Sequence, residues 1–416
     1  MYNRILHRGF TLIELLVVIA IIAILAVVVV VTLNPAQLLA QSRDANRVSD
    51  MATLNSALSL YQIDRGGVGG MGTSSVVYTS FSDTSSTCGN QNLPIVPSGY
   101  TYNCTKSTST RNTNGQGWIP LNFQNISSGA PFGSLPIDPS NTSSSRLYYT
   151  YDTNGSLYET TASMESSKYK MGGSSDVISS DGGTLASVYE KGTGLELEPL
   201  DYGDKSLVGL WTMDEGTGGT SGVTQAYDYS GNGNTGTWYG TAAGTSGYYS
   251  PGKVGPWMGT FNGNTYITSS YASIWSNPFT ITMWINPSNL SGYHFIFTLS
   301  NSYTSYQTVD IHTNGQTLSF SFNDGDVPSF SSMSTSQWYF IAATYNPSTL
   351  TRSLYVNGAF ANSYTSGSSL SIPANGPTYI GCRWDGYNFS GLMDDVRIYG
   401  RALSAAEIQA MYNAGK

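Results

Sequence analysis

One stretch near the N-terminus limits the folds open to this chain: residues 10–33 are apolar apart from Glu14. A helix of that length spans the roughly 30 Å hydrocarbon core of a membrane. Residues 1–9 are polar and basic, and no basic residue follows the stretch closely, so we expect the leader in the cytoplasm and the rest of the chain outside. An ordinary secretory signal has a shorter apolar region followed by a small-residue cleavage site, and neither is found here.

Glu14 requires a partner, because an unpaired carboxylate inside a membrane-spanning helix costs about 3 kcal/mol. Cleavage between Gly9 and Phe10 would create an α-amine close to Glu14. The sequence Gly-Phe-Thr-Leu-Ile-Glu at 9–14 resembles the cleavage and methylation motif of type IV pilins and type II secretion pseudopilins. The resemblance implies processing after Gly9 by a prepilin peptidase, N-methylation of Phe10, and a Glu14 that pairs with the terminal amine of an adjacent subunit. A plain single-pass anchor is the alternative, in which neither Gly9 nor Glu14 has a purpose.

The helix is expected to continue beyond the membrane, so that residues 10–64 form one transmembrane and amphipathic helix. Apolar residues recur at three- and four-residue spacing through residues 36–62. Pro35 lies inside this pattern, which predicts a kink there. A helix of this length suits a shared filament core better than a free globular domain.

Residues 65–170 are rich in Ser, Thr and Asn and are expected to form a small globular head. Cys88 and Cys104 are expected to form a disulfide, since paired cysteines of exported domains usually oxidise; a reduced pair is the alternative. Asn154-Gly155, between alternating aromatic and polar residues, predicts a β-hairpin. The order of helix, loop, Leu-Pro-Ile-Asp-Pro at 135–139 and hairpin resembles the small α/β head of pseudopilins.

Residues 171–206 lose periodicity and gain Gly, Ser and acidic residues, which predicts a linker. Residues 207–416 are expected to be a separate all-β domain, a two-sheet sandwich. A final helix is predicted from Ser404 as its N-cap and Glu407 as the partner in a capping box. The predicted strands are 207–213, 234–240, 266–270, 279–285, 294–300, 307–313, 316–322, 337–345, 352–358, 378–382 and 393–399.

Five stretches of the C-terminal region, taken in order, resemble a known family; they are 209–218, 226–237, 279–287, 337–358 and 389–412. The family that they resemble is the laminin-G-like, concanavalin A-like jelly roll, so the expected sandwich is a jelly roll. The resemblance implies a module that binds glycans or proteins, frequently with one calcium ion.

A structural Ca²⁺ site is expected from acidic and amide side chains in this domain, because Ca²⁺ takes six to eight oxygen ligands. Asp228, Asn232 and Asn234 lie in a glycine-rich loop, and Asp395 is the expected second carboxylate, since alternation directs Asp394 to the other face. The alternative is an Asx-turn at Asp228, with Asp395 paired to Arg397 or Arg401.

Ligand contacts are expected from Trp384, Asp385 and Tyr387 in an exposed turn, because aromatic side chains stack on sugars. Cys382 is expected to be a buried free thiol. The domain holds only two glutamates, Glu215 and Glu407, and no strand carrying paired carboxylates, so no enzymatic activity is expected.

Composition excludes other functions. With 18 basic and 26 acidic residues the net charge is −8, which is unsuited to nucleic-acid binding. The expected protein is a pilin-like subunit of a type IV pilus-type filament that displays its sandwich for surface adhesion. It would cross the inner (cytoplasmic) membrane once before assembly and lie in an extracellular filament or at the cell surface afterwards. Its partners would be other pilin subunits, a prepilin peptidase, and a glycan or surface protein. A pseudopilin of a type II secretion-like system, or a membrane-tethered carbohydrate-binding protein that does not polymerise, are the alternatives.

Overall fold

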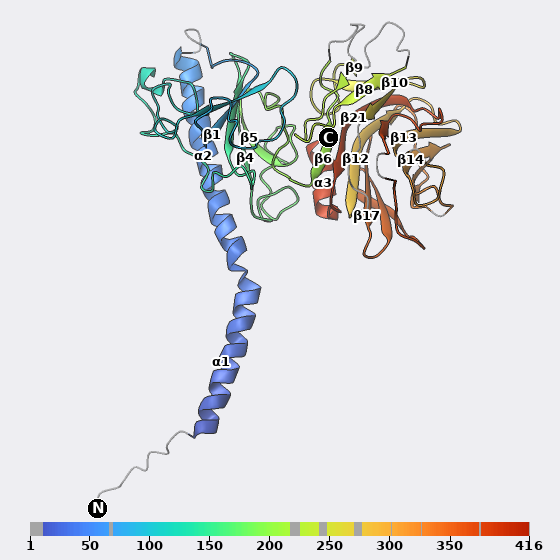
Figure 1. The fold of residues 1–416 in the computed structure, drawn as a ribbon, viewed down its shortest axis with the longest axis horizontal. Helices are drawn as coiled ribbons and strands as arrows, with labels where there is room; N and C mark the ends of the chain where they lie inside the picture. The colour runs from blue at the N-terminus through green and yellow to red at the C-terminus, as the bar shows by residue number, and fades with distance from the viewer. Residues whose placement is uncertain are drawn as a thin grey trace, which may run out of the picture.

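Two β-rich domains lie side by side, and a long helix projects away from them toward the N-terminus (Figure 1). The structure is a computed structural model. It describes residues 11–65, 70–216, 225–240, 248–269, 277–300, 302–325, 327–373 and 376–415, with the side chains of 28–33, 248 and 249 left out. The predicted leader, Gly9 and Phe10 lie outside the described residues.

The long helix is two helices, α1 (Leu12–Leu33) and α2 (Pro35–Arg65). They meet at Asn34, whose φ of 40° lies in the left-handed region that Asn adopts more readily than most residues. Pro35 then begins α2, where its missing N–H removes no hydrogen bond. The interruption predicted at Pro35 is therefore found one residue earlier, because proline is tolerated in a first turn but not in a helix interior.

α1 begins with a capping box formed by Thr11 and Glu14. The Thr11 hydroxyl accepts from the Glu14 N–H, and Glu14 Oε2 accepts from the Thr11 N–H at 2.8 Å. No helix among the described residues combines the length and the apolar character that crossing a membrane requires.

The head is a five-stranded sheet with α2 packed against it. Its strand order is β2-β1-β3-β4-β5, with β1 and β2 parallel and the other neighbours antiparallel. The predicted hairpin is β3–β4, turned at Asn154 and Gly155. The core combines the apolar face of α2 with aromatic side chains such as Trp118 and Tyr149. The strands are β1 (Val76–Ser82), β2 (Thr101–Thr105), β3 (Tyr149–Thr153), β4 (Tyr158–Ser163) and β5 (Val188–Gly192), with a short 3-10 helix at Phe123–Asn125.

The structure corrects the prediction that residues 171–206 are a linker. This segment supplies β5, which pairs with β4 along its length. It also contributes Leu200 and Tyr202 to a buried cluster around Tyr148, whose ring stacks on that of Tyr202 at 4.5 Å. Glycine, serine and acidic residues resemble a linker in composition, but here many of them form tight turns whose carboxylates accept backbone hydrogen bonds, as Asp181 and Asp201 do.

The C-terminal domain is a jelly-roll-like sandwich of two eight-stranded sheets, so the chain contains three sheets in the described part. The first sheet has the order β19-β18-β17-β12-β21-β10-β9, with β6 also on β21, and the second has the order β16-β15-β14-β13-β20-β11-β8-β7. All eleven predicted strands are present. The first sheet contains β6 (Leu207–Trp211), β9 (Tyr248–Tyr249), β10 (Met258–Asn262), β12 (Phe279–Pro287), β17 (Tyr339–Asn346), β18 (Thr351–Val356), β19 (Ala359–Thr365) and β21 (Ser390–Tyr399). The second contains β7 (Gln225–Ala226), β8 (Gly236–Tyr239), β11 (Tyr266–Ser269), β13 (Tyr293–Leu299), β14 (Val309–Asn314), β15 (Thr317–Ser321), β16 (Ser329–Phe330) and β20 (Thr378–Ile380).

The two faces of the first sheet are both buried. Its inner face meets the second sheet across one large apolar core that includes Ile281, Met283 and Ile285 from β12. Its outer face carries Trp284 and Phe340, which pack with residues of the terminal helix α3 (Ala405–Ala414). Ala186 of the head belongs to the same cluster, and Met171 of the head packs against it. The predicted capping box of Ser404 and Glu407 starts α3.

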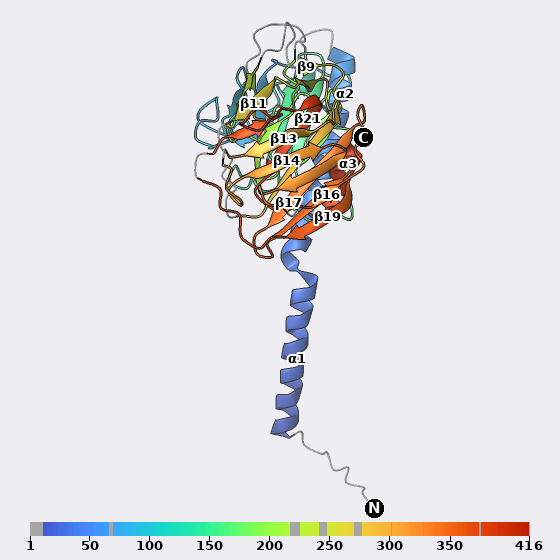
Figure 2. The ribbon, with the colours of Figure 1, turned by 90° about the vertical axis from the view of Figure 1, so that its right-hand side faces the viewer.

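Head and sandwich are joined by direct bonds between them. Ile95 N donates to Gly231 O at 3.1 Å, and Asp201 N donates to Tyr229 O at 3.0 Å. Arg401 pairs with Asp204 at 2.8 Å. A view turned by 90° shows both domains on the same end of the helix pair, with α1 extending from beneath them (Figure 2).

Candidate functional site

Aromatic and polar side chains line two cavities on the outer face of the second sheet. Alternation along its strands sends Ile267, Ile311 and Ile380 into the core, and their strand neighbours outward. In β13 a register shift between Phe295 and Phe297 leaves Phe295 out of the core cluster and facing His312, at 4.9 Å between rings.

The loop between β20 and β21 folds back over this face. Asn388 forms isolated bridges to both Cys382 and Phe295, which fixes the loop where β13 meets β20. Arg383 donates twice to Asp385, from Nε at 2.8 Å and from Nη2 at 2.6 Å. Its guanidinium also lies over the ring of Phe295, 4.1 Å from the centroid. This loop is therefore held by a charge-assisted pair and an aromatic platform.

Two cavities lie on either side of this loop, and Arg383 lines both. Neither contains a residue of the core cluster between the sheets, so both open on the outer face. The first, about 390 Å³, is lined by Tyr293, Phe295, Asp310, His312, Ser321, Asn323, Asp324, Arg383 and Tyr387. The second, about 360 Å³, is lined by Tyr239, Tyr266, Thr268, Pro377, Tyr379, Cys382, Arg383, Trp384, Gly386 and Asn388.

Burial controls the titration of the groups in the first cavity. It raises the pKa of Asp310 to about 7, although the carboxyl accepts a hydrogen bond from Thr298 Oγ1 at 2.9 Å that favours its ionised form. Burial and the nearby Arg383 charge lower the pKa of His312 to about 4. Asp324 is bound by both terminal nitrogens of Arg352, at 2.6 and 2.7 Å. At neutral pH the cavity thus contains a neutral imidazole and compensated ion pairs.

The three predicted ligand contacts all lie on this loop, where Trp384 and Asp385 contact Tyr303 and Tyr387 contacts Phe295. The Trp384 ring meets that of Tyr303 edge-on at 4.2 Å, and Tyr303 Oη donates to Asp385 Oδ2 at 3.2 Å. Trp384 lines the second cavity and Tyr387 the first, while Asp385 holds Arg383. Whether they contact a ligand stays a prediction.

Sequence reasoning missed the strand residues that complete both cavities, among them Tyr239, Tyr293 and Asp310. These residues come from strands far apart in the chain, and only the sheet order β14-β13-β20-β11-β8 makes them neighbours. An aromatic or polar residue at an outward position of a strand is a weak signal that could have drawn attention to them.

The proposed calcium ligands from the glycine-rich loop are used for hydrogen bonding within the fold. Asp228 Oδ1 accepts from the N–H groups of Leu210 and Ser230, and Oδ2 accepts from Asn234 N at 2.8 Å. The Asn232 side-chain amide donates to Leu207 O at 2.8 Å. The loop is thereby tied to β6 in the Asx-turn that the sequence allowed as the alternative.

Asp395 takes no part in the hydrogen bonds of the Asp228 loop. It pairs with Arg397 at 2.7 Å, and both side chains are buried. Its φ of 54° falls at an irregularity in β21, and neighbouring Asp394 accepts from the N–H groups of Lys253 and Val254. Among the described residues, no three His, Cys, Asp or Glu side chains are grouped to hold a metal ion. As arranged, the four residues do not fit a calcium site.

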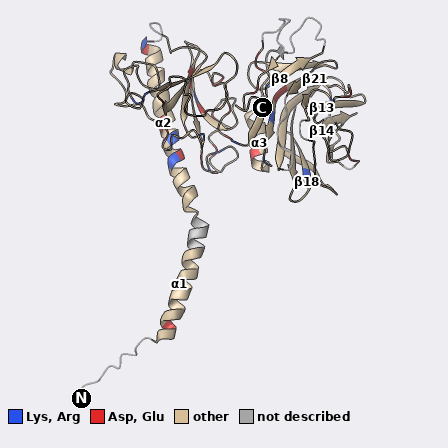
Figure 3. Cartoon of the chain, viewed as in Figure 1, with Lys and Arg blue, Asp and Glu red and all other residues tan. Residues whose placement is uncertain are grey.

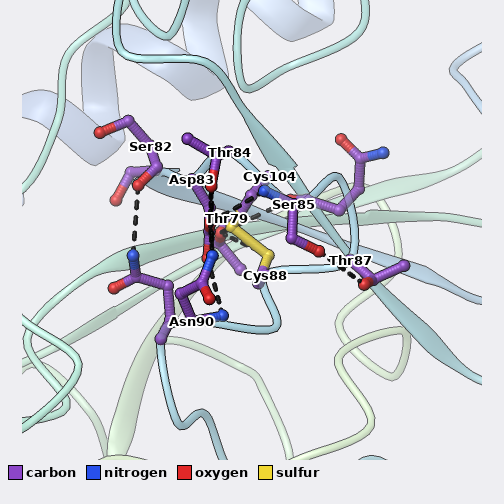
Figure 4. The surroundings of a disulfide bond; sticks show 12 residues. Thr79, Ser82, Asp83, Thr84, Ser85, Thr87, Cys88, Asn90 and Cys104 are labelled. Carbon is purple, nitrogen blue, oxygen red and sulfur yellow. Dashed lines mark hydrogen bonds between the residues drawn. A yellow bond between two sulfur atoms is a disulfide. The ribbon is translucent and has the colours of Figure 1, made fainter.

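Cys88 and Cys104 form a disulfide, with 5.2 Å between their Cα atoms. It closes the loop that joins β1 to β2, beside Thr79 and the Asp83–Asn90 hydrogen bonds (Figure 4). The third cysteine, Cys382, is a free and buried thiol whose pKa is raised to about 12 by burial.

The sandwich has the architecture of concanavalin A-like domains. Residues 261–409 match the concanavalin A-like lectin/glucanases superfamily, and residues 6–30 match the prokaryotic N-terminal methylation motif. Both resemblances inferred from the sequence are thus confirmed. The chain joins a prepilin-type methylation motif to a concanavalin A-like domain.

Solved structures similar to about half of this chain include domain 4 of an extracellular arabinanase from Geobacillus stearothermophilus, determined in complex with arabinotriose. That match has 22% identity and a TM-score of 0.40, and covers 50% of this chain and 98% of that one. The Trypanosoma rangeli sialidase matches at 13% identity and a TM-score of 0.37, over 50% of this chain and 33% of the sialidase. The binding domain of botulinum neurotoxin serotype D/C matches at 14% identity and a TM-score of 0.40, over 51% of this chain and 52% of the neurotoxin chain. Curated proteins gave no match.

Proposed function

We propose that this protein is a pilin-like subunit of a type IV pilus-type filament, and that its sandwich is a carbohydrate-binding domain displayed for attachment. One observation carries the proposal: a prokaryotic N-terminal methylation motif at residues 6–30 and a concanavalin A-like lectin/glucanases domain at 261–409 occur in the same chain. The motif supports processing after Gly9 by a prepilin peptidase and N-methylation of Phe10. Before assembly the chain would cross the inner membrane once through residues 10–33.

The surface of α1 supports a role in assembly. Its described side chains from Leu12 to Val27 are exposed and almost entirely apolar, and they contact neither β-rich domain. Charged residues are scarce along this helix and more common along α2 (Figure 3). An apolar helix of this length is unfavourable in water, so lipid before assembly and neighbouring subunits afterwards would cover it.

Glu14 is the residue that we assign to assembly. In the isolated chain its carboxylate completes the capping box with Thr11. In a filament it would instead compensate the α-amine of Phe10 from an adjacent subunit, because a carboxylate buried among apolar helices needs an opposite charge.

The junction between head and sandwich supports outward display. Bonds from Asp201, Asp204 and Ile95 hold the sandwich against the head, on the end of the molecule opposite to Leu12. A filament built on α1 would therefore carry the sandwich at its periphery. Such a location suits capture of a surface glycan.

The proposal includes no catalytic activity. A retaining glycosidase requires two available carboxyl groups about 5 Å apart. Of the two acidic side chains that line the cavities, Asp324 is paired with Arg352, which leaves Asp310 without a second available carboxyl group. Cleavage of a neutral polysaccharide by the purified protein would contradict this part of the proposal.

Two experiments test the filament role. Cells are imaged with an antibody against residues 207–416, and label along surface fibres is expected. Label confined to a short envelope structure would favour a secretion pseudopilin, and diffuse label would favour a tethered protein that never assembles.

The second experiment replaces Glu14 by Val. The variant should be processed and inserted normally, since its helix becomes more apolar, yet yield few fibres. The matched control is Ile13→Val, which changes a neighbouring side chain without touching the charge. Normal fibre yield from Glu14→Val would refute the pairing role.

A further inference from the structure

The exposed aromatic side chains of the sandwich gather on one face. Among the described residues of this domain, the large apolar side chains that remain exposed are Tyr239, Tyr293, Tyr303, Tyr387 and Phe360, each at least 47% exposed. The four tyrosines line the two cavities or contact the loop between them. Phe360 lies on β19, an edge strand of the other sheet. A cluster of exposed rings beside cavities is typical of a binding surface.

The two cavities follow one another across the sheet, on either side of the Arg383 loop. The first lies over β15, β14 and β13, and the second over β20, β11 and β8, which are consecutive in the strand order. Six strands at a spacing of about 4.8 Å span about 24 Å, which exceeds the length of a single sugar ring. Arg383 lines both cavities from the loop at their boundary.

The arginines beside the two cavities are already paired with carboxylates. Arg383 is engaged in two bonds by Asp385, and Asp324 in two bonds by Arg352. Among the residues that the structure describes, no lysine lines either cavity. Neither cavity therefore offers a cation without a partner to a ligand carboxylate or sulfate, and the net charge of −8 further disfavours anions.

We propose that an uncharged oligosaccharide binds across the Arg383 loop, with sugar rings in both cavities. The inference rests on the proposed carbohydrate-binding function and specifies its ligand and its site. In the first cavity the apolar face of one ring would pack on Tyr293, and Asp310 would hydrogen-bond its hydroxyls. In the second cavity another ring would pack on Tyr239, whose ring stacks on Tyr266 at 5.5 Å.

The test begins with a glycan array that carries neutral and acidic glycans. The full chain is applied in micelles of lauryldimethylamine oxide, a detergent without a sugar headgroup. Binding to neutral oligosaccharides is expected. Binding to acidic glycans alone would overturn the inference while leaving a carbohydrate-binding function intact. Binding to no glycan would overturn both.

Variants then locate the site by fluorescence titration with the neutral oligosaccharide that binds best on the array. Tyr239→Ala and Tyr293→Ala should each raise Kd about tenfold, because each removes one stacking surface. Both residues are about half exposed, so these variants should fold. Phe360→Ala, an equally exposed aromatic on the other sheet, is the control and should leave Kd unchanged.

The pattern of affinity losses in the two tyrosine variants shows whether the ligand occupies one cavity or both. Loss from both tyrosine variants supports a ligand that spans the loop. Loss from only one would show that a single cavity binds the sugar and would overturn the spanning arrangement. Loss from neither, with binding retained, would place the carbohydrate site elsewhere on the protein.

Discussion

Arg47 is the buried cation on which the attachment of α2 to the head depends. Its side chain is fully buried, and it pairs with Asp138 at 2.6 Å and with Asp44 at 2.7 Å. Asp44 in turn accepts the N–H groups of Glu165 and Ser166 beyond β4. One guanidinium thus ties the helix to two loops of the head.

Replacing Arg47 by Met should lower the free energy of unfolding of the head by about 3–5 kcal/mol, because two carboxylates stay buried without their cation. The control is Arg43→Met, which should cost much less, because the pair of Arg43 with Glu165 is partly exposed to solvent. Hydrogen exchange of peptides from α2 and β4 measures both losses locally. Equal losses would contradict the prediction.

Asp228 decides whether the sandwich needs calcium. Its oxygens accept three backbone N–H groups, which already stabilise the loop without a metal ion. We therefore expect the melting temperature of the sandwich to stay unchanged when EDTA is added. A lower melting temperature that calcium restores would show instead that the ion expected from the family resemblance is bound.

At the scale of elements, alternation of apolar and polar residues predicted strands well. The eleven predicted strands of the sandwich all occur, and those missed in that domain are short, polar or at a sheet edge. β19 lies at a sheet edge with mostly exposed residues, and β10 contains Gly and Asn, so neither shows a clear pattern. β5 was missed because its segment reads as a linker, whereas pairing with β4 is decided by the head sheet.

The disulfide stabilises the connection from β1 to β2. It encloses a sequence separation of 16, for which loop closure in the unfolded chain corresponds to about 3 kcal/mol. The free energy of unfolding of the double variant Cys88→Ser, Cys104→Ser should be lower by about that amount, as measured by urea unfolding of the head. Reductant should destabilise the parent chain and leave the double variant unaffected; an equal response of both would argue against the disulfide.

At the scale of the whole molecule, buried carboxyl groups make stability depend on pH. Burial raises the pKa of Glu198 and of Asp214 to about 8, and that of Asp181 and Asp310 to about 7. At a pH between the usual carboxyl pKa and these raised values, the folded chain keeps protons on these groups that the unfolded chain releases. Raising the pH through this window therefore favours unfolding.

We expect the free energy of unfolding to fall as the pH rises from about 4.5 to 8, by about 1.4 kcal/mol per pH unit for each proton held. Glu198→Gln keeps the side-chain shape and removes one such proton, so its stability should fall less over the same range. Unfolding in urea at several pH values gives both curves. A stability that rises with pH in this window would contradict the raised pKa values.

The sequence by itself determined the features that local chemistry controls. These are the methylation motif around Gly9 and Glu14, the capping box at Ser404, the strands of the sandwich, and the loop that carries Trp384 and Tyr387. Each depends on residues adjacent in the chain, so spacing and residue type are sufficient to predict it.

The tertiary structure alone decided what depends on distant segments. It made residues 171–206 part of the head, bound Asp228 and Asp395 into hydrogen bonds and an ion pair, and gathered Tyr239, Tyr293 and Asp310 around Arg383. Strand order and register determine which outward side chains become neighbours. Those are long-range pairings, and no local pattern of apolar and polar residues encodes them.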